Sequence, residues 1–287
     1  MPDSEEIKYA FKLAGLQEHV VWAEKIRPQV QDLPDNILRI LEYGFSEMLN
    51  NAIDHSEGTT VAVWIQRSSE EVKIWIMDDG IGIFNKIKKV LNLEDPHDAI
   101  LELSKGKFTT DPEHHTGEGI FFTSRACDSF FILSDIIRFG RFQNADWLVK
   151  QEELPNKGTS VIMEVNYKTK RTLNQVFDEF ASEHEEYGFT RTRVPIALGQ
   201  YGPDGLMSRS KARRVLNRFS RFKEVILDFV NVDFIGPAFA DEIFRVYAKS
   251  HPDVHILWVN ANESIQKMIQ KALQSANSKS PADDIES

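Results

Sequence analysis

The alternation of apolar and polar positions divides the chain into two stretches that differ in the order of their predicted helices and strands. Up to about residue 166, helical patterns come first and are followed mainly by strands with period-two alternation. From Tyr167 onwards, short apolar strands alternate with helices, which predicts a small α/β layer. We therefore expect two domains, which suits a length of 287 residues because single domains usually have ~100–200 residues.

Turn residues and apolar runs define the expected elements of both stretches. In the first they are helices at 5–30 and 34–56, strands at 59–66 and 72–77, a polar loop at 104–116, a helix from Gly119, and antiparallel strands at 130–139, 145–150 and 160–165. In the second they are a linking helix at 173–181, strands at 192–198, 225–230 and 255–260, and helices at 208–219, 238–249 and 264–273. The resulting organisation is an N-terminal helical segment (1–33), a first domain (34–168), a linking helix (169–186), a second domain (187–275) and a disordered tail (276–287).

The chain is acidic, with a formal net charge of −10, and it has one cysteine, Cys127. An acidic surface repels nucleic acids and anionic lipids, so neither is expected as the main partner. A single cysteine excludes an intrachain disulfide and favours a reducing compartment. No apolar stretch approaches the ~20 residues that span a bilayer, and the N-terminus lacks the apolar segment of a signal peptide. We therefore expect a cytoplasmic protein.

The segment from Phe45 to Ser56 carries the most informative polar residues. On a helix with about 100° per residue, Glu47, Asn51 and Asp54 fall on one narrow stripe, opposite the apolar side chains that face the core. A solvated helix face is the simpler interpretation of this stripe taken alone. However, the adjacent Asn50 and Asn51 cost helix stability in mid-helix relative to Lys, Gln or Ala. A functional role that offsets this cost is the alternative.

Three glycine-containing turns follow at the ends of strands and helices. The turn Asp78–Gly82 comes directly after a strand, where an acidic side chain can accept a hydrogen bond from an exocyclic amine. Gly117 and Gly119 open a helix, whose N–H groups and dipole favour an anion. The pair Gly158-Thr159 begins the last strand of this stretch. Each turn is weak evidence alone, since ordinary tight turns use the same residues.

Together, in this order and spacing, these segments resemble the motifs of the GHKL superfamily, which includes histidine kinases, anti-sigma-factor kinases, DNA gyrase B, MutL and Hsp90. Phe45–Ser56 resembles its N box, Asp78–Gly82 its G1 box, Thr116–Ile120 its second glycine box, and Gly158-Thr159 its closing strand. The resemblance covers residues 34–166. It implies an α+β fold, a two-layer α/β sandwich of the Bergerat type that binds Mg-ATP.

The resemblance also implies a role for each matching residue. Asn51 would be the Mg²⁺ ligand that links the ion to the phosphates, which suits an ion that prefers oxygen donors. Glu47 would be the catalytic base that activates water or a hydroxyl group. The other nucleotide-binding residues would be Asp78 at the adenine amino group, Gly80 and Gly82 at the base pocket, Gly117 and Gly119 at the phosphates, Thr159 at the adenine edge, and Asp54, where gyrase-like members also carry an acidic residue.

Other residues near these motifs keep simpler interpretations. The loop Ser104–His115 would be the ATP lid, and its Lys105 and Lys107 are either phosphate contacts or, more simply, a solvated basic pair. A metal site at residues 114–115, both histidines, lacks further ligands at suitable spacing. Cys127 is expected to be a packed thiol.

The second domain has a different signature, in Val225–Asp241 and His255–Asn260: an apolar strand, an acidic turn, a Gly-Pro bend, a helix and a second apolar strand. It resembles the STAS-like modules related to anti-anti-sigma factors, which implies a smaller α/β domain. Phosphorylatable members carry a serine where this chain has Gly236-Pro237-Ala238, so a binding surface is expected here and not a phosphorylation switch. The basic helix at 208–219 either docks an acidic partner or, more simply, is a solvated face.

Four functions can be weighed against these features. We favour a regulatory protein in which Mg-ATP binding controls what the STAS-like module binds. A protein serine kinase of the anti-sigma type or a slow ATPase is the alternative, which Glu47 supports. A sensor histidine kinase would need a phosphoacceptor helix that the sequence lacks, and a degenerate site would not retain Asn51 and Asp78. The expected partners are ATP and an unidentified protein, with regulators of transcription as one class, and a homodimer stays open.

Overall fold

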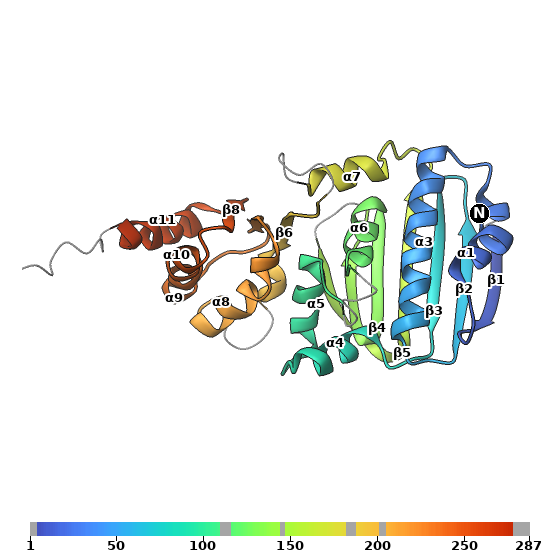
Figure 1. The fold of residues 1–287 in the computed structure, drawn as a ribbon, viewed down its shortest axis with the longest axis horizontal. Helices are drawn as coiled ribbons and strands as arrows, with labels where there is room; N and C mark the ends of the chain where they lie inside the picture. Colours follow the sequence, from blue (N-terminus) through green and yellow to red (C-terminus); the bar gives the residue numbers. More distant parts are fainter. Residues whose placement is uncertain (1–4, 110–115, 144–146, 182–187, 201–204, 278–287) are drawn as a thin grey trace, which may run out of the picture. The chain divides into compact units, whose positions relative to one another are not determined.

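Two compact units make up the computed structural model, which describes residues 5–109, 116–143, 147–181, 188–200 and 205–277 (Figure 1). The boundary between the units follows Glu179, at the end of a short helix. None of the helices in these described ranges is long and apolar enough to cross a membrane.

The first unit is built on a five-stranded antiparallel sheet in the order β1-β2-β3-β5-β4. Every second side chain along β3 is buried, because one face of the sheet packs against helices. This sheet with its helical layer confirms the predicted α+β sandwich. The strands are β1 (Glu5–Lys12), β2 (Thr60–Arg67), β3 (Glu71–Asp78), β4 (Ser129–Arg141) and β5 (Leu148–Asn166).

Helices α3 (Asp35–His55) and α6 (Gly119–Ala126) pack against each other on this layer (Figure 1). Gly44 of α3 allows the close approach of α6, since a Cβ at Gly44 would lie 2.9 Å from Cγ2 of Thr123. The helix that carries the predicted site residues therefore packs on β3 and β5 of the sheet and lies beside α6, which packs on β4. The other helices of this unit are α1 (Glu18–Val21), η1 (Trp22–Ile26), α2 (Arg27–Val30), α4 (Ile83–Leu91), α5 (Pro96–Lys105) and α7 (Leu173–Glu179).

The start of the chain corrects the prediction of a helix over residues 5–30. Glu5–Lys12 forms β1, which pairs with β2 in a register that sets Tyr9 opposite Val63. Its exposed and partly buried side chains alternate, as they do in a strand with one covered face. Helical structure starts at Glu18. The segment 1–33 is therefore not a helical appendage, because its strand belongs to the sheet of the first unit.

Three other boundaries differ from the predicted elements. β5 is one strand that runs through the expected turn at 155–158, and irregular pairing near Asp135 of β4 absorbs the change of register. α5 continues to Lys105, so the first residues of the expected loop are helical. α11 (Glu263–Asn277) includes two residues of the predicted disordered tail, and the rest of that tail lies outside the described residues, as does 110–115 of the loop.

The second unit contains a parallel three-stranded sheet in the order β6-β7-β8. Phe244 and Trp258 meet edge to face at 5.5 Å, and this contact joins β8 to the helices. The arrangement confirms the predicted small α/β layer. Its elements are β6 (Arg191–Pro195), η2 (Ile196–Gly199), α8 (Arg209–Leu216), η3 (Phe219–Arg221), β7 (Glu224–Asp228), α9 (Pro237–Asp241), η4 (Glu242–Tyr247), α10 (Ala248–Ser250), β8 (His255–Val259) and α11.

Candidate functional site

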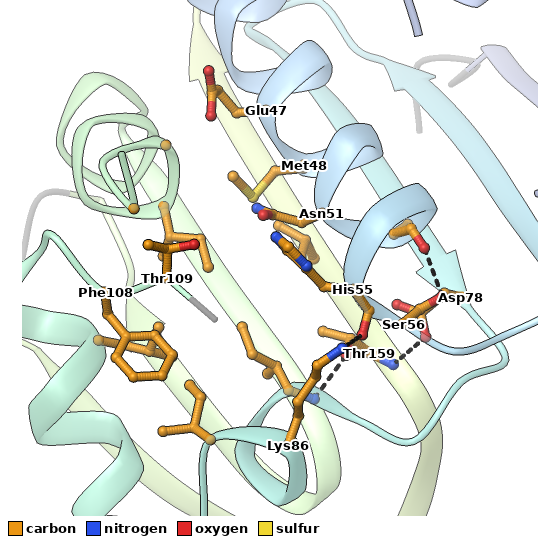
Figure 2. A pocket seen from close by; sticks show the side chains of 18 of the residues that line it. Glu47, Met48, Asn51, His55, Ser56, Asp78, Lys86, Phe108, Thr109 and Thr159 are labelled. Carbon is orange, nitrogen blue, oxygen red and sulfur yellow. Dashed lines mark hydrogen bonds between the residues drawn. The ribbon is translucent and has the colours of Figure 1, made fainter. Parts of the chain in front are cut away.

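A pocket of about 250 Å³ opens in the first unit between α3, α4 and the start of α6 (Figure 2). Residues of β3 and β5 form the part of the pocket lining that the sheet contributes. Further lining residues come from the end of α5 and from Phe108 and Thr109, which follow it. Glu47, Met48, Asn51 and His55 follow one another along α3 towards Asp78 (Figure 2). Glu47 and Asn51 therefore line a cavity and do not lie on a fully solvated helix face.

Asp78 lies at one end of the pocket, where β3 ends. Its Oδ1 accepts hydrogen bonds from the backbone N–H groups of Gly80 at 2.9 Å and Thr159 at 3.1 Å. These bonds fix the carboxylate at this end of the pocket. Burial raises the pKa of Asp78, and the two backbone bonds partly offset this because they favour the ionised form.

Glycines allow the segments around Asp78 to pack closely. Gly82 has a φ of 84°, and a side chain there would overlap with Oγ of Ser134. A side chain at Gly158 would overlap with the backbone carbonyl of Asp78. Gly80 has a different role, because a side chain there would overlap with the backbone carbonyl at the end of α3. Gly82 lines the pocket, whereas Gly80 holds the turn against α3 outside the pocket lining.

Thr159 connects this end of the pocket to α4, because its Oγ1 accepts a hydrogen bond from the N–H of Ile83 at 3.0 Å. Asp79, the second residue of the Asp-Asp pair, instead fixes the start of β2. It accepts bonds from the N–H groups of Thr60 at 2.9 Å and Thr59 at 2.7 Å, and these bonds lower the pKa of Asp79. The two adjacent aspartates therefore differ, since one faces the pocket and the other holds the fold together.

The other end of the pocket lies between α3 and the start of α6. Glu47 and Asn51 are half-buried there, so a carboxylate and an amide border the same space. Gly117 has a φ of 72° and packs on the backbone of Phe108, and Gly119 is the first residue of α6. The N–H groups and dipole of a helix start favour an anion. This end can therefore receive the phosphates of a nucleotide.

Asn51 offers one oxygen donor to a metal ion, and no group of three or more His, Cys, Asp or Glu among the described residues could hold a metal by itself. A Mg²⁺ ion that arrives with a nucleotide suits this donor set, because Mg²⁺ takes phosphate oxygens and keeps several waters. The residues present therefore fit an ion shared with phosphates and do not form a cage of their own.

Besides Gly80, the predicted candidates Asp54, Lys105 and Lys107 lie outside the pocket lining. Asp54 is exposed on α3, and Lys105 is buried in α5 with its Nζ 2.7 Å from Oε1 of Glu102. This buried ion pair corrects the prediction for Lys105, which neither lies in solvent nor reaches the pocket. Residues 114–115 lie outside the described residues. Cys127 is buried, as predicted for a packed thiol, and burial raises the pKa of its thiol to about 12.

Among the lining residues to which the sequence prediction gave no role are His55, Lys86 and Phe108. His55 follows Asn51 by one helical turn, so helical spacing carried a signal for it. Lys86 lies on α4, and its Nζ donates a hydrogen bond to the carbonyl oxygen of His55 at 2.6 Å (Figure 2). Phe108 has no local signal, because its place depends on the contact with Gly117 on the far side of the loop.

The basic helix of the second unit is partly neutralised by ion pairs. Nε of Arg213 donates to Oε1 of Glu242 at 2.7 Å, and Arg209 lies 3.1 Å from Asp241. Lys211 of the same helix is buried. Arg209 and Arg213 are thus ion-paired while their side chains stay mostly exposed, as on a solvated helix face, and docking of an acidic partner stays a prediction.

Family comparisons agree with this geometry. The family described as histidine kinase-, DNA gyrase B- and HSP90-like ATPase matches residues 37–169, the part of the chain that contains the whole pocket lining. A STAS-like domain of unknown function (DUF4325) matches residues 211–266, inside the second unit. A search among curated proteins found no match. Residues 37–169 are thus a histidine kinase-, DNA gyrase B- and HSP90-like ATPase domain, and a STAS-like domain follows it in the same chain.

Proposed function

We propose that this chain is a regulatory protein that binds Mg-ATP and whose nucleotide state controls the binding of a protein partner through the STAS-like module. ATPase domains of this family bind ATP, usually together with Mg²⁺. One observation carries the proposal. A carboxylate suited to the adenine amine, Asp78, and a set suited to phosphate and Mg²⁺, with Asn51, Gly117 and Gly119, lie at two ends of one pocket.

Different residues of the pocket bind different parts of the nucleotide in this proposal. Oδ2 of Asp78 accepts a bond from the exocyclic amine, while Oδ1 stays bonded to the backbone. Gly82 and Thr159 shape the base site. Asn51 would supply an oxygen ligand to a bound Mg²⁺ ion. Bound Mg-ATP supplies a transferable phosphoryl group, and the protein supplies the orientation.

The regulatory part of the proposal rests on the second unit. α9 of the STAS-like module begins Pro237-Ala238, with no hydroxyl group that could accept a phosphoryl group at that place. If phosphorylation at that place does not control partner binding by the module, another signal must do so. The nucleotide bound by the ATPase domain of the same chain can be that signal. Such control requires the partner to bind the ATP state and the nucleotide-free state with different affinities.

A second candidate function, a protein serine kinase or a slow ATPase, is favoured by Glu47. A domain that only binds ATP does not need a carboxylate at the phosphate end of its pocket. Glu47 lies there, beside the first turn of α6. In this role it accepts a proton from the attacking water or hydroxyl group.

Isothermal calorimetry with ATP and ADP, each with Mg²⁺ and with EDTA, tests the binding proposal. We expect binding of both nucleotides and tighter binding of ATP when Mg²⁺ is present. A γ-phosphate release assay on the same sample then separates a binding protein from an enzyme. Absence of nucleotide binding under all four conditions would contradict the proposal.

Hydrogen exchange of the full chain tests the coupling between the domains. Saturating Mg-ATP should change amide exchange within residues 211–266 as well as around the pocket. The chain with Asp78→Ala is the control, because it should lose both changes together. If Mg-ATP protects the pocket and leaves the STAS-like residues unaltered, the regulatory proposal fails while ATP binding stands.

A further inference from the structure

Two glycines at the phosphate end of the pocket are present for different physical reasons. Gly117 has a positive φ of 72°, a conformation that favours glycine over other residues. Gly119 instead has helical conformation as the first residue of α6. Alanine favours a helix more than glycine does, so the backbone alone does not explain a glycine at position 119.

The position of the Glu47 side chain explains why residue 119 is a glycine. A Cβ at Gly119 would overlap with Oε2 of Glu47 and would lie 2.8 Å from its Cδ and 3.1 Å from its Cβ. The glutamate thus lies along the first turn of α6, with its carboxylate directly over the α-carbon of Gly119. Any larger residue at 119 would have to move the carboxylate or the helix.

A second glycine contact holds the same two helices close together. Gly44 lies one helical turn before Glu47 on α3, and a Cβ there would be 2.9 Å from Cγ2 of Thr123 on α6. The side chain of Thr123 on α6 therefore packs over Gly44 of α3, and the side chain of Glu47 on α3 packs over Gly119 of α6. The pair of contacts sets the distance between α3 and α6 and, with it, the place of the carboxylate.

We propose that Gly119 is a positioning residue for Glu47, which keeps the carboxylate at the start of α6 by leaving no side chain in its way. This role goes beyond a contact between Gly119 and phosphate. Its catalytic consequence rests on the proposed function of the pocket, whereas its structural part can be tested without any nucleotide.

A double-mutant cycle on thermal unfolding tests the structural part. Gly119→Ala in the full chain should lower the melting temperature by a few degrees, because the added methyl group displaces the flexible end of the half-buried Glu47 side chain. In the Glu47→Ala background, the same change should cost less than about 1 °C or stabilise the helix, because the overlapping side chain is gone. An equal loss in both backgrounds would overturn the proposal.

The test stays decisive if the Gly119→Ala chain does not fold. The double variant should then fold, and failure of both would overturn the proposal. Glu47→Gln separates size from charge, because it keeps the volume of the side chain. Gly119→Ala should cost as much in the Gln background as in wild type, and a much smaller cost there would show that charge, and not space, explains the glycine.

Gly199→Ala is the matched control, since Gly199 is a buried glycine at the end of a short helix in the other unit. A Cβ there would overlap with no atom: it would make a tight contact of 3.3 Å with Cδ2 of Leu206, the end of a flexible side chain, and an ordinary contact of 3.5 Å with Cγ2 of Val215. It should leave both melting and nucleotide binding close to wild type.

Calorimetry and phosphate release test the catalytic consequence. Gly119→Ala should lower the turnover rate at least tenfold, and this loss should exceed any loss of affinity for Mg-ATP that follows from the place of Gly119 in the pocket lining. A large loss of affinity with unchanged turnover would assign Gly119 to phosphate binding and overturn the positioning role. If the wild-type chain neither binds nor turns over ATP, the proposed function fails, while the melting cycle still decides the structural part.

Discussion

The two ends of the pocket are built in different ways. Around Asp78, backbone groups from the loop after β3 and from β5 converge on one carboxylate, so the base site is fixed by hydrogen bonds within the fold. At the other end, Glu47 and Asn51 project from α3 towards the glycines that open α6. The first end depends on local bonds, and the second depends on the distance between two helices.

This contrast separates affinity from reactivity. A site that is fixed before the ligand arrives loses little entropy on binding, so the base end should determine affinity for any adenine nucleotide. A carboxylate held at the phosphate end contributes only where a bond is made or broken, so it should determine turnover. Variants at the two ends should therefore have different kinetic signatures.

The largest effect is expected for Glu47→Ala. Removal of a general base typically costs ~10²–10⁴-fold in rate, so any phosphate release should fall to background while Mg-ATP affinity changes little. Single-turnover release and calorimetry on the same protein measure both quantities. Asp54→Ala, on the exposed part of the same helix, is the control and should keep most of the activity. Turnover at the wild-type rate in Glu47→Ala would remove Glu47 from the chemistry.

Asp78→Ala should have the next largest effect, a loss of about 100-fold in affinity for ATP and ADP alike, with or without Mg²⁺. The variant loses the acceptor for the amine and leaves two buried N–H groups without their partner. Asp79→Ala is a matched control, because that carboxylate bonds to the start of β2 and does not line the pocket. Equal losses of affinity in both variants would mean that general stability, and not base recognition, had been measured.

Asn51→Ala should weaken ATP binding about tenfold with Mg²⁺ and little with EDTA, because its amide acts through the ion. Its neighbour Asn50 lies outside the pocket lining, so Asn50→Ala should leave both titrations unchanged. Calorimetry under both conditions gives the comparison. A loss of the same size with EDTA would contradict the role of Asn51 as an ion ligand.

The smallest effect concerns the stability of the nucleotide-free chain. Burial raises the pKa of Asp78 above 3.8, so the ionised carboxylate costs stability at neutral pH. That cost disappears as the pH falls through the folded pKa towards 3.8. Asp78→Asn keeps an oxygen acceptor and removes the charge, so it should melt a few degrees higher at pH 7. Calorimetric scans should show this gap close on acidification, and a gap that widens instead would contradict the burial argument.

The sequence predicts the helical and strand-end parts of the site well, because their signals are local. Asn51 and Glu47 share a stripe that helix periodicity alone can place, and Asp78 follows an alternating strand. The family motifs then supply the order in which these pieces meet. The structure adds the contact between Glu47 and Gly119, which no spacing indicates because it depends on the packing of two helices.

The two parts that the sequence prediction got wrong have different causes. In β1 the large apolar residues Ile7, Tyr9 and Phe11 stand at every second position, as in a strand, but the place of this strand in the sheet depends on pairing with β2, which starts at Thr60. The sequence places Lys105 in a loop as a cation. In the structure α5 extends to Lys105, and the buried carboxylate of Glu102, one helical turn earlier, neutralises its charge. The pairing of β1 and the burial of Lys105 are tertiary contacts, which local patterns do not specify.

The edge strand β1 has a practical consequence for anyone who wishes to study the ATPase domain as a fragment. The family match begins at residue 37, but the sheet begins at Glu5, and β1 is the outermost strand beside β2. A fragment cut at the family boundary would uncover the hydrogen-bonding groups of β2 along its full length, next to the half-exposed Trp64. Exposed strand edges of this kind pair with other chains, so such a fragment should precipitate or self-associate where the chain that includes β1 does not.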